Sequence, residues 1–409
     1  MSLHVFDVLQ ERGFIAQVTD EKDVRRLLDE EKITFYVGFD STATSLHAGS
    51  LVPIMAMMHL QRAGNRPIAI VGGGTTMVGD PSGRDEMRQL LTEEAIRANG
   101  KAIHAQLNRY LHFDEEKALA LDNADWLLPL GYVQFLREIG VHFSVNRMLA
   151  AEAYKQRLEK GLSFIEFNYQ LLQAYDYLFL YKEYGCKLQM GGDDQWGNIL
   201  AGVDLIRRVS GAKVKAMTFP LLTTASGAKM GKSATGAVWL DGERLSPYDF
   251  FQYWINCDDR DVPRFLKMFT FLPKNEIDRL AALQGSKIRE AKRILAFEAT
   301  KVTHGESAAQ KAMETAEAAF GDGGTLEAMP VTQIPAKRLA SGVSPLDLFT
   351  EVGLTSSRGE AKRLVKQGGM YVNDKRVESI EARLDEKDLA ENGILLRAGK
   401  KKYHRIVVT

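Results

Sequence analysis

A candidate anion-binding turn lies within residues 34 to 50, where a strand pattern changes into a helix pattern. Thr34 to Phe39 is rich in β-branched and aromatic residues, which is typical of a buried strand. From Leu46 apolar residues recur at helical spacing, and the turn before them carries His47 and Gly49. Free N–H groups at a helix start, with a His and a small Gly beside them, suit an anion such as phosphate. An ordinary βα turn with a capping histidine would have the same pattern.

A second candidate for phosphate chemistry is the stretch Ser-Gly-Ala-Lys-Met-Gly-Lys-Ser at residues 226 to 233. Lys229 and Lys232 lie three positions apart among Gly and Ser residues, which favour a flexible loop. Taken alone, this pattern is more typical of a solvated basic turn.

Three polar side chains share one face of a long apolar helix, which we expect over residues 163 to 184. Tyr169, Gln173 and Asp176 fall at positions i, i+4 and i+7. The helix is apolar nearly all round, so we expect it to be buried or at an interface. Because a buried carboxylate needs partners, the three residues indicate either a ligand pocket or an internal hydrogen-bond network.

The elements that would position these residues are those of a parallel α/β sheet. Pro67 to Gly73 and Cys186 to Met190 are further buried strands by their apolar runs, and a polar Gly-rich turn follows each. In an open parallel sheet, turns at the carboxyl ends of the strands gather around one crevice. We therefore expect the turns at residues 40–50, 72–83 and 191–197 to converge.

The second of these turns nearly matches a phosphate-binding P-loop at Gly74 to Gly79. Asp80 and Pro81, however, stand where a P-loop has Lys and Ser or Thr. A carboxylate there would repel phosphate, so the sequence excludes a P-loop NTPase.

The composition is that of a globular protein with two or three domains. The chain has 409 residues, of which 45% are hydrophobic, and its 53 basic residues equal its 53 acidic ones. Nucleic-acid binding would therefore need local basic patches. Cys186 and Cys257 are the only cysteines, which excludes a disulfide framework or a Cys-rich zinc site and fits a reducing cytosol. Since there is neither a bilayer-length apolar run nor a signal pattern, we expect a cytoplasmic protein without membrane contact.

Two of the stretches resemble the paired ATP signatures of class I aminoacyl-tRNA synthetases. His47-Ala-Gly-Ser50 is similar to His-Ile-Gly-His, and Lys229-Met-Gly-Lys-Ser233 is similar to Lys-Met-Ser-Lys-Ser. Both occur in the order and at about the separation of that family. Over nearly its whole length the chain resembles the bacterial tyrosyl-tRNA synthetases.

The resemblance implies an α/β fold with a second and a third part. A Rossmann-type catalytic domain would cover residues 1–223, with a dimer-interface insertion at about 120–180. The lysine loop and a helical, anticodon-side domain would cover 224–320, and a linker 321–340. A small S4-like α+β domain would cover 341–409 and bind RNA.

Two further features agree with this organisation. Ser357 to Gly369 is a short basic helix by its pattern, Met370 to Val377 is a hairpin, and Arg397 to Arg405 is rich in Lys and Arg. A cationic face of this kind suits RNA phosphates. The family is homodimeric, and the apolar segment around Phe135 to Leu149 is the candidate interface.

The implied reaction joins tyrosine to tRNA(Tyr) in two steps. The tyrosine carboxylate attacks the α-phosphorus of ATP and releases pyrophosphate, and a terminal ribose hydroxyl of the tRNA then takes the tyrosyl group. Mg²⁺ would arrive with ATP, and no protein-bound metal is expected. Catalysis would consist of positioning and charge stabilisation, without a covalent enzyme intermediate.

The resemblance also implies roles for single residues. The residues expected to bind the substrate tyrosine are Tyr36, Asp80, Tyr169, Gln173, Asp176 and Gln195. The residues expected to bind ATP are Gly38, Asp40, Gly49, Ser50, Gly192, Asp194 and Lys232. The residues expected to act on the phosphates are His47, Lys229 and Lys232, with Arg84 and Arg88 as weaker candidates.

Four positions depart from the family pattern. Ser50 replaces the second His of the first signature, so it keeps a hydrogen-bond donor but carries no charge. Gly231 replaces a Ser and is expected to loosen the loop. Ser41 and Thr44 stand where relatives often have Pro and Asp. None of these changes removes a group that the chemistry requires.

Three other functions compete with this interpretation. A tryptophanyl enzyme shares the fold and both signatures, but Tyr36 with Asp176 and the S4-like end of the chain argue against it. A non-catalytic RNA-binding protein would have no need of His47 and the lysine pair. An adenylyltransferase that does not use tRNA would leave the basic C-terminal region unexplained.

Overall fold

The chain folds into two compact units in a computed structural model, Met1–Glu306 and Ser307–Thr409. The structure describes residues 4–82, 91–114, 116–150, 154, 158, 161–225, 227, 230–233, 236–320, 331–373, 375–390, 393–399 and 402–408. Each unit is described by itself.

A five-stranded parallel sheet with the order β3-β2-β1-β4-β5 forms the centre of the first unit. Its strands are β1 (Thr34–Asp40), β2 (Arg66–Gly72), β3 (Leu119–Asp122), β4 (Cys186–Gly192) and β5 (Lys215–Phe219). The strands expected from apolar runs are therefore confirmed, as is the α/β class. The direction of strand order reverses between β1 and β4, and ligands bind at such a reversal in open α/β sheets.

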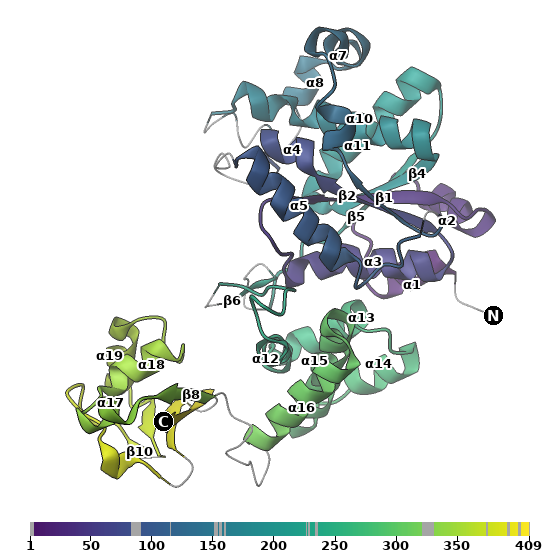
Figure 1. Ribbon diagram of the computed structural model, residues 1–409. Coiled ribbons are helices and arrows are strands. Elements are labelled where there is room, and N and C mark those ends of the chain that lie inside the picture. Colours follow the sequence, from purple (N-terminus) through teal and green to yellow (C-terminus); the bar gives the residue numbers. More distant parts are fainter. Residues whose placement is uncertain are drawn as a thin grey trace. The chain divides into compact units, whose positions relative to one another are not determined.

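Helices cover both faces of this sheet. In Figure 1, α10 and α11 lie above the sheet and α3 lies below it. The helices of this part are α1 (Val5–Glu11), α2 (Glu21–Glu30), α3 (Leu51–Arg62), α4 (Gly73–Val78), α5 (Glu93–Leu107), α6 (Ala124–Leu127), α7 (Tyr132–Glu138), α8 (Val145–Leu149), α10 (Phe164–Tyr184) and α11 (Trp196–Ser210).

Helix α10 begins and ends at clear local signals. The Ser163 side chain accepts from the Glu166 N–H, and the Glu166 carboxylate accepts from the Ser163 N–H, which is a capping box. Gly185 ends the helix in the left-handed region, with φ of 62°. These two ends fix the register of the polar residues along the helix.

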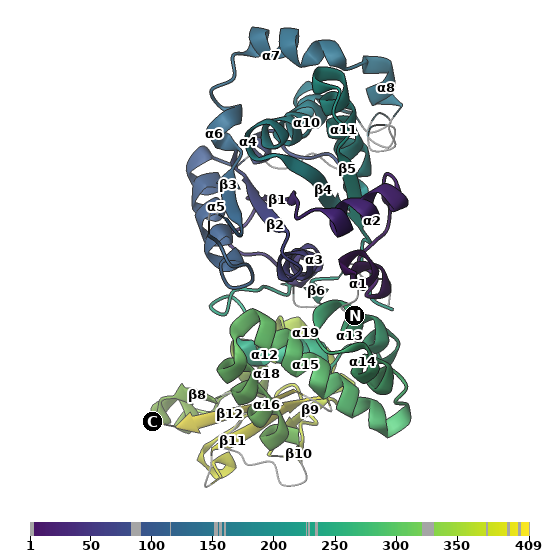
Figure 2. The same cartoon turned by 90° about the vertical axis from the view of Figure 1, so that its right-hand side faces the viewer.

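A helical part follows the sheet within the first unit. Figures 1 and 2 place it on the side of the sheet where α3 lies, and α13 packs against α3. A short antiparallel pair, β6 (Lys232–Ser233) and β7 (Gly236–Ala237), precedes it. Its helices are α12 (Pro247–Ile255), α13 (Val262–Phe269), α14 (Lys274–Ala281) and α15 (Ile288–His304). The fully buried Trp254 packs against Phe265 and Phe269 in its core.

The second unit holds a mixed sheet with the order β10-β9-β11-β12-β8. Its strands are β8 (Val331–Ile334), β9 (Met370–Val372), β10 (Lys375–Arg376), β11 (Ile394–Ala398) and β12 (Lys402–Val408). Its helices are α16 (Glu306–Phe320), α17 (Ala336–Ala340), α18 (Pro345–Glu351) and α19 (Arg358–Lys366). The basic helix and the hairpin that the sequence predicts are thereby confirmed.

Two segments differ from expectation. The helical pattern from 286 to 320 is split at Gly305, where φ of 87° ends α15 before α16 begins. Part of the expected linker, 331–340, forms β8 and α17 instead. Strand β8 is four residues long and exists through parallel pairing with β12, which no local pattern reveals.

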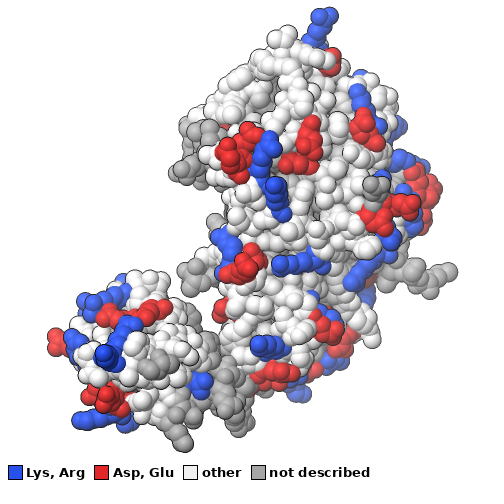
Figure 3. All heavy atoms as spheres, viewed as in Figure 1, with Lys and Arg blue, Asp and Glu red and all other residues white. Residues whose placement is uncertain are grey.

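Basic and acidic side chains are interspersed on the face of the molecule shown in Figure 3. This agrees with the equal totals of 53 residues of each sign. Within the described ranges, no helix has the length and apolar character needed to cross a membrane.

Arg12 ties the N-terminal segment to the end of α13. Its guanidinium donates to the carbonyl oxygens of Lys267 (2.9 Å), Thr270 (2.6 Å) and Leu272 (2.7 Å). We expect Arg12→Met to lower the free energy of unfolding by about 1–3 kcal/mol, because carbonyls that are partly buried lose a charged donor. Urea unfolding of the purified protein measures this change.

Arg26→Met is the matched control. Arg26 is exposed and, among the described residues, bonds to Asp23 alone, on its own helix, so its loss should cost less than about 0.5 kcal/mol. Equal losses in the two variants would contradict the role given to Arg12.

Candidate active site

A cavity of about 810 Å³ opens where the strand order of the parallel sheet reverses. This volume lies within the range of small-molecule sites. Its walls come from β1, from β4 and from the three turns at residues 40–50, 72–80 and 191–195. The turns that the sequence expects to converge therefore do meet at one place.

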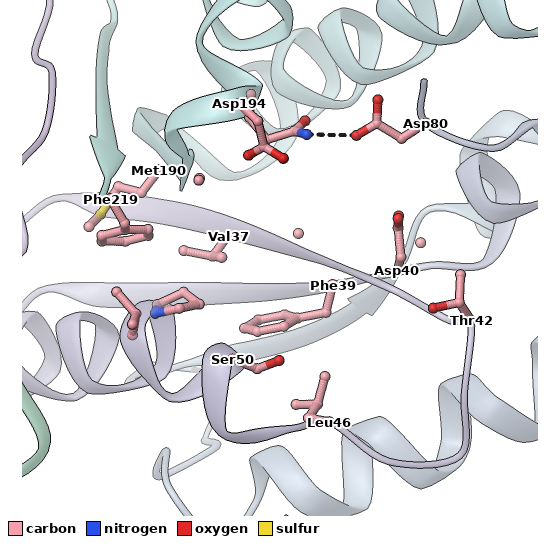
Figure 4. A pocket seen from close by; sticks show the side chains of 18 of the residues that line it. Val37, Phe39, Asp40, Thr42, Leu46, Ser50, Asp80, Met190, Asp194 and Phe219 are labelled. Atoms are coloured by element: carbon pink, nitrogen blue, oxygen red, sulfur yellow. Dashed lines mark hydrogen bonds between the residues drawn. The ribbon is translucent and has the colours of Figure 1, made fainter. Parts of the chain in front are cut away.

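Most residues predicted to bind substrates line this cavity. Figure 4 shows Asp80 and Asp194 on one side of it and Ser50 on the other. The predicted residues in its wall are Tyr36, Gly38, Asp40, His47, Gly49, Ser50, Asp80, Tyr169, Gln173, Asp176, Gly192, Asp194 and Gln195.

The cationic candidates are placed less completely. Lys232 begins strand β6, and only its backbone is described. Lys229, Arg84 and Arg88 lie outside the described residues. The roles given to these four residues stay predictions.

The Asp176 carboxylate is buried at one end of the cavity between two neutral donors. Asn123 Nδ2 donates to Oδ2 at 2.9 Å and Trp126 Nε1 donates to Oδ1 at 2.8 Å. Burial raises the pKa of Asp176 to about 7, although both donors favour the charged form. Each donor occupies one lone pair of one oxygen, so the carboxylate can still accept a further hydrogen bond.

Tyr36 lies beside this carboxylate, and only 2% of its surface is exposed to solvent. Its hydroxyl has no hydrogen-bond partner among the described residues, and neither has Oε1 of Gln173. Burial, and secondarily the nearby Asp176, raises the pKa of Tyr36 well above its usual value. Buried polar atoms are almost always satisfied in folded proteins, so this end of the cavity is suited to a polar ligand.

Asp80 forms a second acidic group in the cavity wall. Gln195 Nε2 donates to its Oδ2 at 2.6 Å, the bond drawn as a dashed line in Figure 4, and the Ser82 N–H donates to Oδ1 at 2.9 Å. Burial, followed by the charge of Asp40, raises the pKa of Asp80 to about 6. The groups that act on it within the described residues are hydrogen-bond donors and a carboxylate rather than a cation, so it is suited to a cationic ligand group.

The turn with His47 has the geometry of a helix start. Nδ1 of His47 accepts from the Gly49 N–H at 3.0 Å, which caps the short 3₁₀ turn Ala48–Ser50 and fixes the ring. Helix α3 follows directly, and the Ser50 side chain makes no capping bond to it. The N–H groups of Ala48, Gly49 and Ser50 all donate within the protein, to the Val238 carbonyl, His47 Nδ1 and the His47 carbonyl. The expectation of free N–H groups is therefore wrong for these three residues, and what the turn offers an anion is the Ser50 hydroxyl in the cavity wall and the positive end of the α3 dipole.

Gly231 packs closely against this turn. It has φ of 86°, and a Cβ on it would lie 2.6 Å from Nδ1 of His47 and 2.8 Å from the Gly49 nitrogen. Only glycine fits this conformation and this approach without displacement. Gly231 therefore does more than loosen its loop, since its lack of a side chain lets the loop of Lys232 pack against the turn of His47.

The sequence did not reveal the two donors to Asp176. Asn123 also accepts from the Gly74 N–H at 2.8 Å and donates to Thr75 Oγ1 at 3.0 Å, so it joins the turn after β2 to helix α10. The one hint in the sequence was that Asn123 directly follows β3, because a side chain at that position reaches the carboxyl edge of the sheet. Gln189 and Trp239 also line the cavity without having been predicted.

Comparison with known proteins gives full-length matches. A model of class I tRNA synthetases (W and Y) matches residues 28–321, and a model of the tyrosine–tRNA ligase SYY-like C-terminal domain matches residues 325–406. The protein named tyrosine–tRNA ligase from Clostridium tetani is 54% identical over 408 residues, which is 100% of both chains. Its namesake from Acetivibrio thermocellus is 54% identical over 98% of both chains.

Solved structures agree with these matches. A C-terminally truncated mitochondrial tyrosyl-tRNA synthetase from Aspergillus nidulans is 31% identical, with a TM-score of 0.69 over 76% of this chain and 93% of that one. A tryptophanyl-tRNA synthetase from Encephalitozoon cuniculi shares the fold at 13% identity, with a TM-score of 0.57 over 75% of this chain and 87% of that one. With its sheet, its cavity and both signatures, the chain belongs to the class I tRNA synthetases of the W and Y family.

Proposed function

We propose that this protein is a tyrosine–tRNA ligase, which activates tyrosine with ATP and transfers it to tRNA(Tyr). The observation that carries the proposal is the buried Tyr36 hydroxyl without a partner beside the Asp176 carboxylate. A hydroxyl and a carboxylate at the end of a cavity are complementary to a phenol. The names of the full-length relatives support the same activity.

The tyrosine lies with its phenol at the Tyr36 end of the cavity. Its hydroxyl donates to Asp176 and accepts from Tyr36, while Asp80 neutralises its ammonium group. Tyr169, Gln173 and Gln195 complete the ammonium site. Phenylalanine leaves Tyr36 and Asp176 without a partner, and tyrosyl enzymes are the general illustration of such rejection without editing.

ATP occupies the part of the cavity between the turns after β1 and β4. Asp40 and Asp194 suit the ribose hydroxyls, and the small Gly38 and Gly192 allow the nucleotide to approach the backbone. His47 faces the phosphates.

The phosphate side is completed by donors and cations. Gly49 and Ser50 line this part of the cavity: the small Gly49 leaves room for a phosphate and Ser50 contributes its hydroxyl. Lys229 and Lys232 neutralise the pyrophosphate. Arg84 and Arg88 are weaker candidates for the same task.

The reaction needs no nucleophile from the protein. A carboxylate oxygen of tyrosine attacks the α-phosphorus in line, the bond from that phosphorus to the bridging oxygen breaks, and pyrophosphate leaves. A ribose hydroxyl at the 3′ end of tRNA then attacks the tyrosyl carbonyl carbon, and AMP leaves. Positioning and charge stabilisation lower both barriers.

Mg²⁺ enters with the ATP phosphates, which are its preferred ligands. In the described part of the chain, no group of three or more His, Cys, Asp or Glu side chains could hold a metal ion.

The second unit provides a face for tRNA. Helix α19 buries Ala361 and Val365 and exposes Arg358, Lys362 and Lys366 to solvent. Such a cationic face suits RNA phosphates. The domain division proposed is residues 1–223, 224–320 and a C-terminal domain over 341–409 that β8 and α17 extend at its start. A cytoplasmic location is also part of the proposal.

A homodimer forms through the apolar face of α7, α8 and the short turn between them, Gly140–His142. Tyr132, Val133, Val141 and Val145 are each more than half exposed there, and exposed apolar patches of this kind mark interfaces. Phe135, within the same stretch, is buried inside the subunit.

Exchange of labelled pyrophosphate into ATP tests the first step of the reaction. We expect exchange with tyrosine, but not with phenylalanine or tryptophan, in the absence of tRNA. Exchange with tryptophan would overturn the assignment of the pocket, and no exchange with any of the three would overturn the synthetase activity.

The Tyr36→Phe variant tests the phenol site in the same assay. Loss of one hydrogen bond should raise KM for tyrosine by about 2- to 10-fold, and reduce the preference over phenylalanine by the same factor. Tyr177→Phe is the matched control, because that hydroxyl donates to the Lys215 carbonyl at 2.7 Å. Its tyrosine preference should stay that of the wild type.

The pH dependence of tyrosine binding tests Asp80. An ammonium group needs the ionised Asp80 carboxylate, so affinity should fall as the pH drops through about 6, below the separate change expected near 7 from protonation of Asp176. Asp40→Asn removes the second cause of the raised pKa, and the midpoint should then move to lower pH. Equilibrium binding of tyrosine without ATP measures both midpoints.

Asp125→Asn serves as the control in that titration, because Asp125 is exposed and lies outside the cavity wall. Its midpoint should equal that of the wild type. A midpoint in Asp40→Asn that does not move would contradict the electrostatic role of Asp40.

Val133→Asp and Val141→Asp test the dimer by sedimentation at micromolar concentration. Each places a charge in the apolar face and should yield a species of half the wild-type mass. Val209→Asp changes an exposed valine on α11 and should leave the mass unchanged. A wild-type mass in all three variants would rule out this face as the interface.

A further inference from the structure

The turn that carries His47 is paired with a segment from much later in the chain. The Ala48 N–H donates to the Val238 carbonyl at 2.7 Å, and the Leu240 N–H donates to the Leu46 carbonyl at 2.9 Å. His47 and Trp239 are opposite each other in this short antiparallel bridge. The position of the turn therefore depends on where residues 238–240 lie.

Trp239 and Arg244 form a stacked pair beside this bridge. The Arg244 guanidinium carbon lies 3.6 Å from the centre of the Trp239 ring, close enough for a cation–π interaction. Trp239 also lines the cavity. Arg244 thus restrains a side chain of the cavity wall.

Arg244 returns the chain to the first turn through a second contact. Its Nη1 donates to Thr44 Oγ1 at 3.1 Å. Thr44 precedes His47 by three residues, and His47 faces Trp239. The contacts from Thr44 to Arg244, from Arg244 to Trp239 and from Trp239 to His47 form a closed circuit, which we name the Arg244 clamp.

The clamp also bears on the segment that contains Lys232. Lys232 pairs with Ala237 in the β6–β7 hairpin, and Ala237 is two residues before Trp239. The Val238 N–H donates to the Gly231 carbonyl at 2.8 Å. Fixing Trp239 against His47 therefore sets the backbone of Lys232 relative to the first ATP signature.

We infer that Arg244 and Trp239 are positioning residues for the ATP-dependent step, which hold the Lys232 hairpin and the His47 turn in register. The inference rests on the proposed function. Neither residue needs to touch the reacting atoms, because both act through the backbone of the two signatures.

A purely structural role is a poor account of the clamp. Thr44 and Arg244 are exposed, and exposed contacts add little to stability. The turn is held separately by buried Gln106, whose Oε1 accepts from the Leu46 N–H at 3.0 Å. The clamp is therefore expected to adjust the position of the turn rather than to keep it folded.

A double-mutant cycle tests the clamp in the pyrophosphate exchange assay. Arg244→Met removes the charge and the donor but keeps the length of the side chain, and Thr44→Val removes only the hydroxyl. We expect Arg244→Met to lower kcat/KM for ATP by about 3- to 10-fold, and Thr44→Val by a smaller factor. The double variant should match Arg244→Met alone, because one contact cannot be lost twice.

Two readouts separate positioning from stability. KM for tyrosine and the thermal unfolding midpoint should stay at their wild-type values in every variant of the cycle. Trp239→Phe keeps an aromatic face for the guanidinium and should retain most of the ATP efficiency, whereas Trp239→Leu should lose as much as Arg244→Met. Arg260→Met is the matched control, because Arg260 is exposed and, in the part of the chain that the structure describes, forms its ion pair with Asp258.

Several results would overturn the clamp. The first is a kcat/KM for ATP in Arg244→Met that equals the wild-type value. The second is a double variant whose loss is the product of the two single losses. The third is a rise in KM for tyrosine as large as the loss in ATP efficiency. A wild-type protein without tyrosine-dependent exchange would instead refute the proposed function. The two failures are therefore distinguishable in one assay.

Discussion

The buried carboxylate of Asp176 is the constraint on which the rest of the site depends. A charge removed from water is unfavourable unless donors replace the solvent, and here the donors are the neutral side chains of Asn123 and Trp126. Asn123 is in turn fixed by the backbone of Gly74. One carboxylate thus ties α10, the segment after β3 and the turn after β2 into a rigid floor. Because its partners are neutral, its charge remains available to a ligand.

The two sides of the cavity favour ligand groups of opposite charge. Asp80 lies on one side and Ser50, at the start of α3, on the other (Figure 4). Asp80 and Asp40 lie close enough for the charge of one to raise the pKa of the other, which favours cationic and hydroxyl groups of a ligand. The turn at His47 leads directly into α3, and the positive end of the dipole of that helix favours anions. A molecule with an ammonium group at one end and a phosphate near the other is oriented by this division alone.

The parts that sequence reasoning could predict are those with a local signal. Apolar runs predict β1, β2 and β4, and the spacing of Tyr169, Gln173 and Asp176 places them on one side of α10, all in the cavity wall. Asn123 carries no such signal, because its contact with Asp176 spans 53 residues and depends on the fold. Strand β8 was missed for the same reason, since its identity comes from pairing with β12.

The closeness of Gly231 and His47 has a consequence for how such chains can diverge. The imidazole of His47 occupies the space that a Cβ atom on residue 231 would need. A larger residue at 231 is compatible with this arrangement only if residue 47 shrinks or the backbone moves. The two signatures, distant in sequence, therefore form a single steric unit. The family pattern keeps the His of the first signature and has Ser at the position of Gly231, so chains with that pattern need a different backbone course where the two signatures meet.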